Sequence, residues 1–233
     1  MQLSYLSKKL KSLYNISILI LLLAACITKQ PLVYQPSLNH TVSNNLDTDN
    51  KVADIIKPYT IGMAESMNEV IGYSHSFEEK HKPSSALGNF MCDAVFEITY
   101  NDFKNANFCL LNYGGIRSTL DSGEITVGEM YQLMPFENEI VVLKLEQKYL
   151  DSLRVIVDSK GGEPMSESQT HLLDKDEFFY LVTNDYMANG GDNYSILMNA
   201  IERIETGIKI RDALISYVTQ HDTITFDYSN RNL

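Results

Sequence analysis

Apolar residues recur along the chain with two different periods, which predicts a mixture of helices and strands. Spacings of three or four residues, typical of a helix with one apolar face, cover residues 52–67, 87–98, 126–134, 147–158 and 209–220. Short continuous apolar runs, typical of buried strands, occupy residues 70–73, 106–112, 140–145, 178–183 and 224–226. The alternation predicts an α/β fold of one domain, with a mixed sheet and helices packed on it.

Local signals set some of the predicted boundaries. Ser84 or Ser85 can cap the helix at 87–98, and Thr126 with Glu129 forms a capping box for the next helix. Pro58 should bend or interrupt the first helix. The polar stretches 159–177 and 185–193 are predicted to be loops, and no internal repeat or second domain is visible.

The N-terminus predicts export. Lys8, Lys9 and Lys11 precede an apolar run at residues 16–25. The run is about half the ~20 residues that a membrane-spanning helix needs, so residues 1–25 are predicted to be a signal peptide.

The sequence Leu-Ala-Ala-Cys that ends at Cys26 resembles the bacterial lipoprotein box. That resemblance implies cleavage before Cys26 and lipidation of its thiol, with anchoring in the bacterial cell envelope, at the outer membrane or the periplasmic face. An ordinary signal peptide with an accidental cysteine is the alternative. Residues 26–50 are polar and aperiodic, which predicts a flexible tether ahead of a domain at 51–233.

Composition and charge exclude some classes of function. The 233 residues are 44% hydrophobic and 21% charged, as in globular proteins, and the net charge is −11. All acidic residues lie beyond residue 25, so the exported part would repel phosphate backbones and a nucleic-acid partner is not expected. Cys92 and Cys109 lie in apolar runs, which favours core thiols over a disulfide.

Common catalytic motifs are missing from the sequence. It has no phosphate-binding loop that ends in Lys-Ser or Lys-Thr, no GxSxG, no HExxH and no paired histidines, and the five histidines are scattered. We therefore predict no catalytic residue, no metal site and no cofactor within this chain.

Three loops, each beside a predicted strand, carry the candidate chemistry. The first, residues 112–117, contains Asn112, Gly114, Gly115 and Arg117. The guanidinium of Arg117 can donate hydrogen bonds to phosphate or sugar oxygens. A plain turn with a surface arginine is the alternative.

The second loop, residues 134–138, holds Phe136 behind a stiffening proline, where the ring could stack on a planar ligand or belong to the core. The third, residues 183–192, offers Tyr186, Asn189, Gly190 and Asp192, and the Asp192 carboxylate can accept two hydrogen bonds from a diol. A flexible acidic turn is the alternative there. Together, two rings, an arginine, an amide and a carboxylate would make a nucleotide pocket.

Five segments in order resemble the substrate-binding C-terminal domain of the 5′-nucleotidase family, over roughly residues 50–220. They are LGNFMCDA (87–94), NYGGIR (112–117), GEITVGE (123–129), PFEN (135–138) and NDYMANGGDNY (184–194). The resemblance implies a layered α/β/β/α architecture and a role in nucleotide catabolism.

The resemblance also implies roles for single residues. Phe136 and Tyr186 would sandwich the base, Asn112 would contact the base region, Arg117 would bind ribose or phosphate oxygens, and Asp192 would bind the ribose hydroxyls. In the family, a separate N-terminal metallophosphoesterase domain with two divalent metal ions cleaves the bond. No segment of this chain resembles that domain, so the metal ions are expected on a separate partner.

The chain departs from the family in two places. The family usually has an arginine shortly before the LGN segment, where this chain has Lys80, His81 and Lys82, and the stretch 159–177 is short. Three hypotheses follow. The chain could be the nucleotide-binding half of a split 5′-nucleotidase, an envelope lipoprotein that only binds nucleosides or nucleotides, or a structural lipoprotein with a decayed pocket.

Overall fold

The computed structural model describes residues 10–11, 14–15, 49–166 and 177–231. The chain divides into two units, Met1–Asp49 and Asn50–Leu233. Most of the predicted signal peptide, Cys26 and almost all of the predicted tether lie outside the described residues, as do residues 167–176 of the predicted loop. The second unit contains both sheets of the fold.

A three-stranded mixed sheet forms one part of this unit. It contains β1 (Val70–Ser74), β3 (Gly123–Thr126) and β7 (Thr223–Ile224), in the order β3-β1-β7. Strand β1 pairs antiparallel with β3 and parallel with β7. Gly72 of β1 is required here, because a Cβ at this position would lie 2.5 Å from a Val218 methyl group.

A four-stranded mixed sheet forms the other part. Its strands are β2 (Phe108–Cys109), β4 (Glu139–Glu146), β5 (Phe178–Asn184) and β6 (Glu202–Lys209), in the order β2-β5-β4-β6. Strand β5 is parallel to β2 and antiparallel to β4, and β4 is antiparallel to β6.

Alternating side chains send the two faces of this sheet into two cores. Val142 and Val182 belong to one core, while Leu143 and Leu181 belong to the other. The first core also contains Ile125 of β3, so it joins the two sheets.

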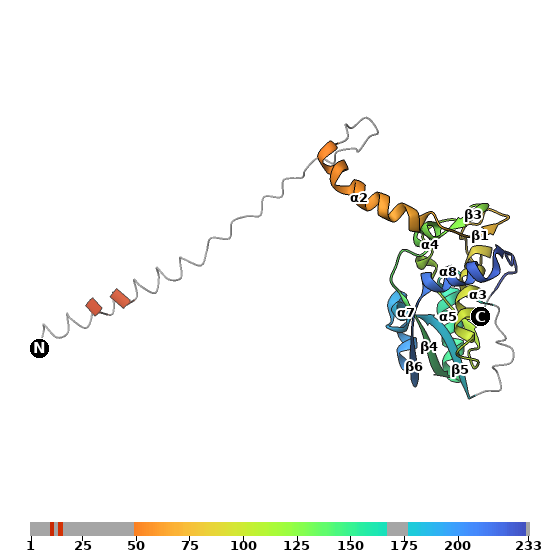
Figure 1. The fold of residues 1–233 in the computed structure, drawn as a ribbon. Coiled ribbons are helices and arrows are strands. Elements are labelled where there is room, and N and C mark those ends of the chain that lie inside the picture. The colour runs from red at the N-terminus through yellow and green to blue at the C-terminus, as the bar shows by residue number, and fades with distance from the viewer. Residues whose placement is uncertain (1–9, 12–13, 16–48, 167–176, 232–233) are drawn as a thin grey trace, which may run out of the picture. The chain divides into compact units, whose positions relative to one another are not determined.

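Helices accompany these sheets in the described part of the unit. They are α2 (Asn50–Met67), α3 (Ala86–Tyr100), α4 (Val127–Leu133), α5 (Leu150–Ser159), α7 (Asp185–Ala188) and α8 (Ile210–His221). Short 3₁₀ turns occupy Tyr113–Gly115, Gln147–Tyr149, Gly191–Asn193 and Ser195–Asn199. Helix α3 packs against α8, and α5 contributes to the core on the opposite face of the four-stranded sheet (Figure 1).

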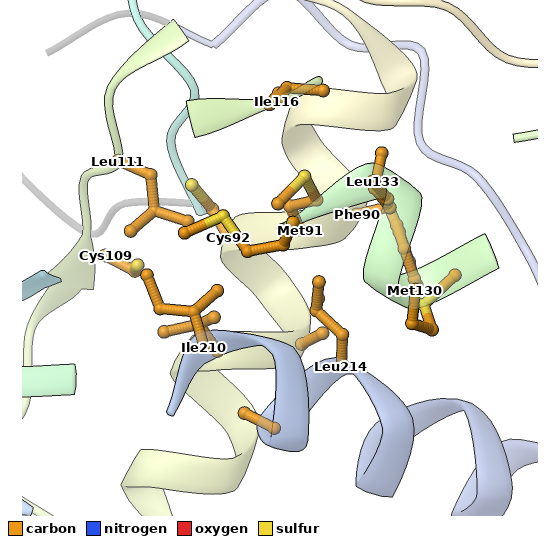
Figure 2. Packing of buried hydrophobic residues seen from close by; sticks show 14 of the residues in the cluster. Phe90, Met91, Cys92, Cys109, Leu111, Ile116, Met130, Leu133, Ile210 and Leu214 are labelled. Atoms are coloured by element: carbon orange, nitrogen blue, oxygen red, sulfur yellow. The ribbon is translucent and has the colours of Figure 1, made fainter. Parts of the chain in front are cut away.

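Helix α3 is central, since 10 of its 15 residues are buried. Ser85 caps it by accepting a hydrogen bond from the Gly88 amide at 3.1 Å. Its apolar side chains meet those of α4 and α8, as Figure 2 shows for Met91, Met130 and Leu214. The predicted core thiols Cys92 and Cys109 are buried and free.

Helix α2 differs, since none of its residues is buried. Pro58 was predicted to bend or interrupt this helix, and of the two effects the interruption is wrong, because the helix continues past Pro58. A proline has no backbone N–H, so the carbonyl oxygen four residues earlier loses its hydrogen bond within the helix. In an exposed helix, water can donate to that carbonyl oxygen instead. Among the described residues, no helix is both long enough and apolar enough to cross a membrane.

The α/β fold class is confirmed, with two mixed sheets and packed helices. Three details differ from the prediction. The apolar run at 106–112 forms a strand only at Phe108–Cys109, residues 185–193 contain α7 and a 3₁₀ turn, and β6 was not predicted. The capping box of α4 is present as predicted.

Candidate functional site

The three candidate loops meet at one edge of the four-stranded sheet. Strands β2 and β5 are parallel, so the loops that follow them leave the same edge. Strand β4 is antiparallel to β5, with Ile140 paired to Asn184, so the loop before β4 arrives at that edge too. The strand directions therefore explain why segments about 70 residues apart share a site.

A cavity of about 670 Å³ lies between these loops. Seven of the nine predicted binding residues line it, together with two that carried no predicted role, Glu137 and Asn138. The seven are Asn112, Gly114, Gly115, Arg117, Phe136, Tyr186 and Asp192. Such a volume suits a small organic ligand.

The other two predicted residues do not line this cavity. The Asn189 side chain accepts a hydrogen bond from Arg203 Nη1 at 2.7 Å and faces a smaller cavity of about 310 Å³. Gly190 has a φ of 86°, in the left-handed region that glycine adopts easily, and it follows the end of α7.

Hydrogen bonds between amides and a carboxylate form the inner side of the cavity. Asn112 donates through Nδ2 to Asp192 Oδ2 at 2.9 Å and accepts through Oδ1 from Asn184 Nδ2 at 3.0 Å. Asn184 also caps α7, since its Oδ1 accepts from the Met187 amide at 2.7 Å. The network links the end of β5 to the loop that follows β2, and it fixes the Asp192 carboxylate in the cavity.

Tyr186 projects from α7 beside this network. Its hydroxyl donates to Asp192 Oδ1 at 3.0 Å and accepts from the Asp192 amide at 3.2 Å. The ring lies against Gly191, where a Cβ would come within 2.6 Å of it. Glycine at 191 is therefore needed for the ring to lie there, and 45% of the Tyr186 surface remains exposed.

Phe136 contributes a second ring from the loop between α4 and β4, with 42% of its surface exposed. The guanidinium carbon of Arg117 lies 5.7 Å from the centre of this ring. Arg117 Nη1 also lies 3.5 Å from the Gly114 carbonyl oxygen. Two half-exposed rings and one arginine therefore face the same cavity.

Charges fix the loop that carries Phe136. Glu137 accepts hydrogen bonds from Lys209 and from Arg211 Nη2, the latter at 2.6 Å. These two hydrogen bonds, with that of Lys209 foremost, lower the pKa of Glu137 to about 2. Asn138 donates to Asp185 Oδ1 at 2.8 Å, which joins this loop to the first turn of α7.

Two residues behind the Tyr113–Gly115 turn carry charge. Glu163 is 5% exposed, and burial raises its pKa. Lys80 donates to the carbonyl oxygens of Tyr113 and Ile116. The sequence gives no sign of a role for Glu163, because an acidic residue in a polar stretch resembles any solvated one. Asn184 could have been recognised as a site residue, since it is a polar residue at the end of a strand.

No group of three or more histidine, cysteine, aspartate or glutamate side chains that could hold a metal ion occurs among the described residues.

Known proteins are similar to this chain in sequence and in fold. Residues 61–153 match the sequence model of the family described as 5′-nucleotidase, C-terminal domain. The chain is similar to this family over that part. It is 24% identical to an apyrase from Tabanus yao and 21% identical to a 5′-nucleotidase from Vibrio vulnificus, in each case over 78% of this chain.

The solved structure of a 5′-nucleotidase precursor from Thermus thermophilus shares the fold. The TM-score is 0.67 at 23% identity, over 78% of this chain and 42% of that one. The curated relatives extend beyond the match as well, since the chain spans 41% of the Tabanus apyrase and 36% of the Vibrio enzyme. The chain is thus related to nucleotide hydrolases and corresponds to about two fifths of their length.

Proposed function

We propose that this protein binds the nucleoside part of a nucleotide and that a separately encoded metallophosphatase, with divalent metal ions, cleaves the phosphoester. The observation that carries the proposal is one cavity lined by two half-exposed aromatic rings and a fixed carboxylate, Asp192. Stacking of a base on such rings is worth about 1–3 kcal/mol per ring, and a carboxylate has room for hydrogen bonds from a ribose diol.

The charges around the cavity favour the nucleoside end of the ligand. Glu137, Asp192 and Arg117 are the charged lining residues, and Glu137 is already paired with Lys209 and Arg211. A phosphate monoester carries close to two negative charges, so Arg117 alone would balance it only in part. We infer that the base and ribose supply most of the affinity, while the phosphate points toward the partner.

Two properties of the relatives support a separate partner. The family is described as a C-terminal domain, and the curated relatives are more than twice as long as the matched part. The proposal assigns the chemistry to a protein that corresponds to the remaining part.

Calorimetric titration of the full chain tests the binding step with adenosine, AMP and a UDP-sugar. We expect measurable affinity for at least one of the three. If none of them binds or shifts the melting temperature, the pocket has decayed and the proposal is wrong.

A second experiment tests the split in function. We expect the purified chain to leave AMP intact with added Mg²⁺ or Mn²⁺, and to accelerate its hydrolysis by the metallophosphatase encoded nearest to it on the chromosome. Hydrolysis by the chain alone would contradict the division of labour. Binding without any effect on the phosphatase would favour a protein that only captures nucleosides or nucleotides.

The cellular location is part of the same proposal. Lipidation of Cys26 would hold the protein at the bacterial envelope, where it could present ligand to a partner on the same membrane. Mass spectrometry of the membrane fraction should find an acylated Cys26 at the mature N-terminus, and Cys26→Ser should release the protein. A mature terminus at another residue would overturn this part.

A further inference from the structure

We infer that Lys80 and Glu163 are positioning residues that together hold the Tyr113–Gly115 turn in the cavity wall. The inference rests on the proposed function, because it explains how that site is kept in shape. Neither residue lines the cavity, and each acts through backbone groups of the turn.

Lys80 binds both ends of the turn from behind. Its Nζ donates to the carbonyl oxygen of Tyr113 at 3.2 Å and to that of Ile116 at 2.6 Å. The same Nζ lies 4.2 Å from the centre of the Tyr113 ring. One ammonium group thus contacts three points of a four-residue segment.

Glu163 binds the same turn at its first residue. The Oε2 atom accepts a hydrogen bond from the Tyr113 amide at 2.5 Å, while the Tyr194 hydroxyl lies 3.4 Å from Oε1. The backbone next to Glu163 is itself fixed, because the Leu111 amide donates a hydrogen bond to the carbonyl oxygen of the neighbouring Pro164 at 3.0 Å. The buried carboxylate of Glu163 and the partly buried Lys80 therefore hold Tyr113 by its N–H and its C=O respectively.

The turn needs such support because its own bonds are few. Gly115 donates to the Asn112 carbonyl at 2.9 Å and Ile116 to the Tyr113 carbonyl at 3.3 Å. Two adjacent glycines leave the backbone free to take many other conformations in the absence of outside contacts. Hydrogen bonds to charged groups are stronger than those between neutral groups, so Lys80 and Glu163 are suited to select one conformation.

This assignment gives Lys80 a different role from a direct phosphate ligand. Two of its three donors are already used by backbone carbonyls. The lysine before the LGN segment would then set the position of Gly114, Gly115 and Arg117, and Arg117 would remain the cation that faces the ligand.

The test compares Lys80→Met with Lys80→Arg in the full chain, with adenosine and AMP as ligands. We expect Lys80→Met to weaken both ligands by the same factor, about tenfold, and Lys80→Arg to restore most of the affinity. Lys104→Met is the matched control, because Lys104 is exposed and its Nζ lies over the ring of Tyr100, 4.7 Å from the ring centre. Loss of affinity for AMP alone would identify a direct phosphate contact and overturn the inference.

A second measurement does not depend on binding. Hydrogen exchange of the Gly115 and Ile116 amides should become at least tenfold faster in Lys80→Met and in Glu163→Ala, and should stay unchanged in Lys104→Met. Unchanged exchange in both variants would overturn the inference even if nucleosides bind. If the wild-type protein binds none of the ligands, the proposed function fails, and the exchange rates alone decide whether the two residues hold the turn.

Discussion

The inner side and the rim of the cavity are built in different ways. The inner side consists of Asn112, Asn184 and Asp192, whose polar groups bond to each other, and Asn112 and Asn184 are 8% and 2% exposed. The rim consists of Arg117, Phe136 and Tyr186, whose side chains are exposed. The inner side should therefore serve both folding and binding, whereas the rim should serve binding alone.

Asn184→Ala should have the largest effect, since it should reduce both the stability of the fold and the binding of the ligand. It removes the cap of α7 and leaves the buried Asn112 Oδ1 without its partner. We expect a loss of about 2–3 kcal/mol in the free energy of unfolding, together with loss of nucleoside binding. Urea unfolding followed by circular dichroism measures the first, and Asn199→Ala, an exposed asparagine, is the control. Wild-type stability in Asn184→Ala would remove the distinction between the two sides.

Phe136→Ala and Tyr186→Ala test the rim. Each should weaken nucleoside binding by about 1–3 kcal/mol, because one stacked face is lost, while the unfolding free energy stays within about 0.5 kcal/mol of wild type. Titration calorimetry with adenosine gives the affinities. Phe77→Ala, which removes an exposed ring outside the cavity, should change neither quantity. Unchanged affinity in both rim variants would exclude stacking between these rings.

Tyr186→Phe refines this result, since it keeps the ring and removes the hydroxyl that bonds to Asp192. Its effect on affinity should be smaller than that of Tyr186→Ala. An equal loss would mean that the hydroxyl, rather than the ring, contributes the binding energy.

The contrast between the two sides also marks what the sequence could predict. The sequence could predict that Arg117, Tyr186 and Asp192 lie at the cavity, because such side chains stand out beside glycine-rich turns after strands, and it could predict Phe136 from the proline before it. The partners that hold them were harder to find. Glu163 reaches the site through the packing of residues 163–166 beside β2, and no local pattern shows such a contact.

The missed strand β6 has a local cause. Ile204, Thr206 and Ile208 alternate with exposed residues, but Gly207 has a φ of 70° and the strand lies at the edge of the sheet. A half-exposed edge strand with charged and glycine residues has a weak apolar signal. Strands β4 and β5 pair on both sides and are buried, so their continuous apolar runs were sufficient.

Arg117→Ala separates the contributions within the rim. It should reduce affinity for AMP by about 1 kcal/mol more than affinity for adenosine, because a guanidinium gains most from a charged phosphate. Arg154→Ala, which removes a partly exposed arginine paired with Asp151, is the control. An equal loss for both ligands would place Arg117 on the ribose.

The smallest expected effect concerns pH and the way the rim is attached. Charge pairs of Glu137 with Lys209 and Arg211 fix the loop that carries Phe136, whereas the Asn112–Asn184 contact on the inner side joins two groups that do not titrate.

The pKa of Glu137 is about 2 in the folded protein against an ordinary value of 4.5, so the carboxylate stabilises the fold above pH 4.5 and this contribution disappears as the pH falls toward 2. Melting temperatures between pH 5 and 2 should therefore drop more in wild type than in Glu137→Gln, where the group cannot titrate. Asp227, whose pKa is also about 2, changes in the same window, but it is present in both proteins and cancels in the difference. If the melting temperatures of wild type and Glu137→Gln fall equally with pH, the charge of Glu137 does not hold the rim loop. The position of that loop would then depend on the hydrogen bond between Asn138 and Asp185.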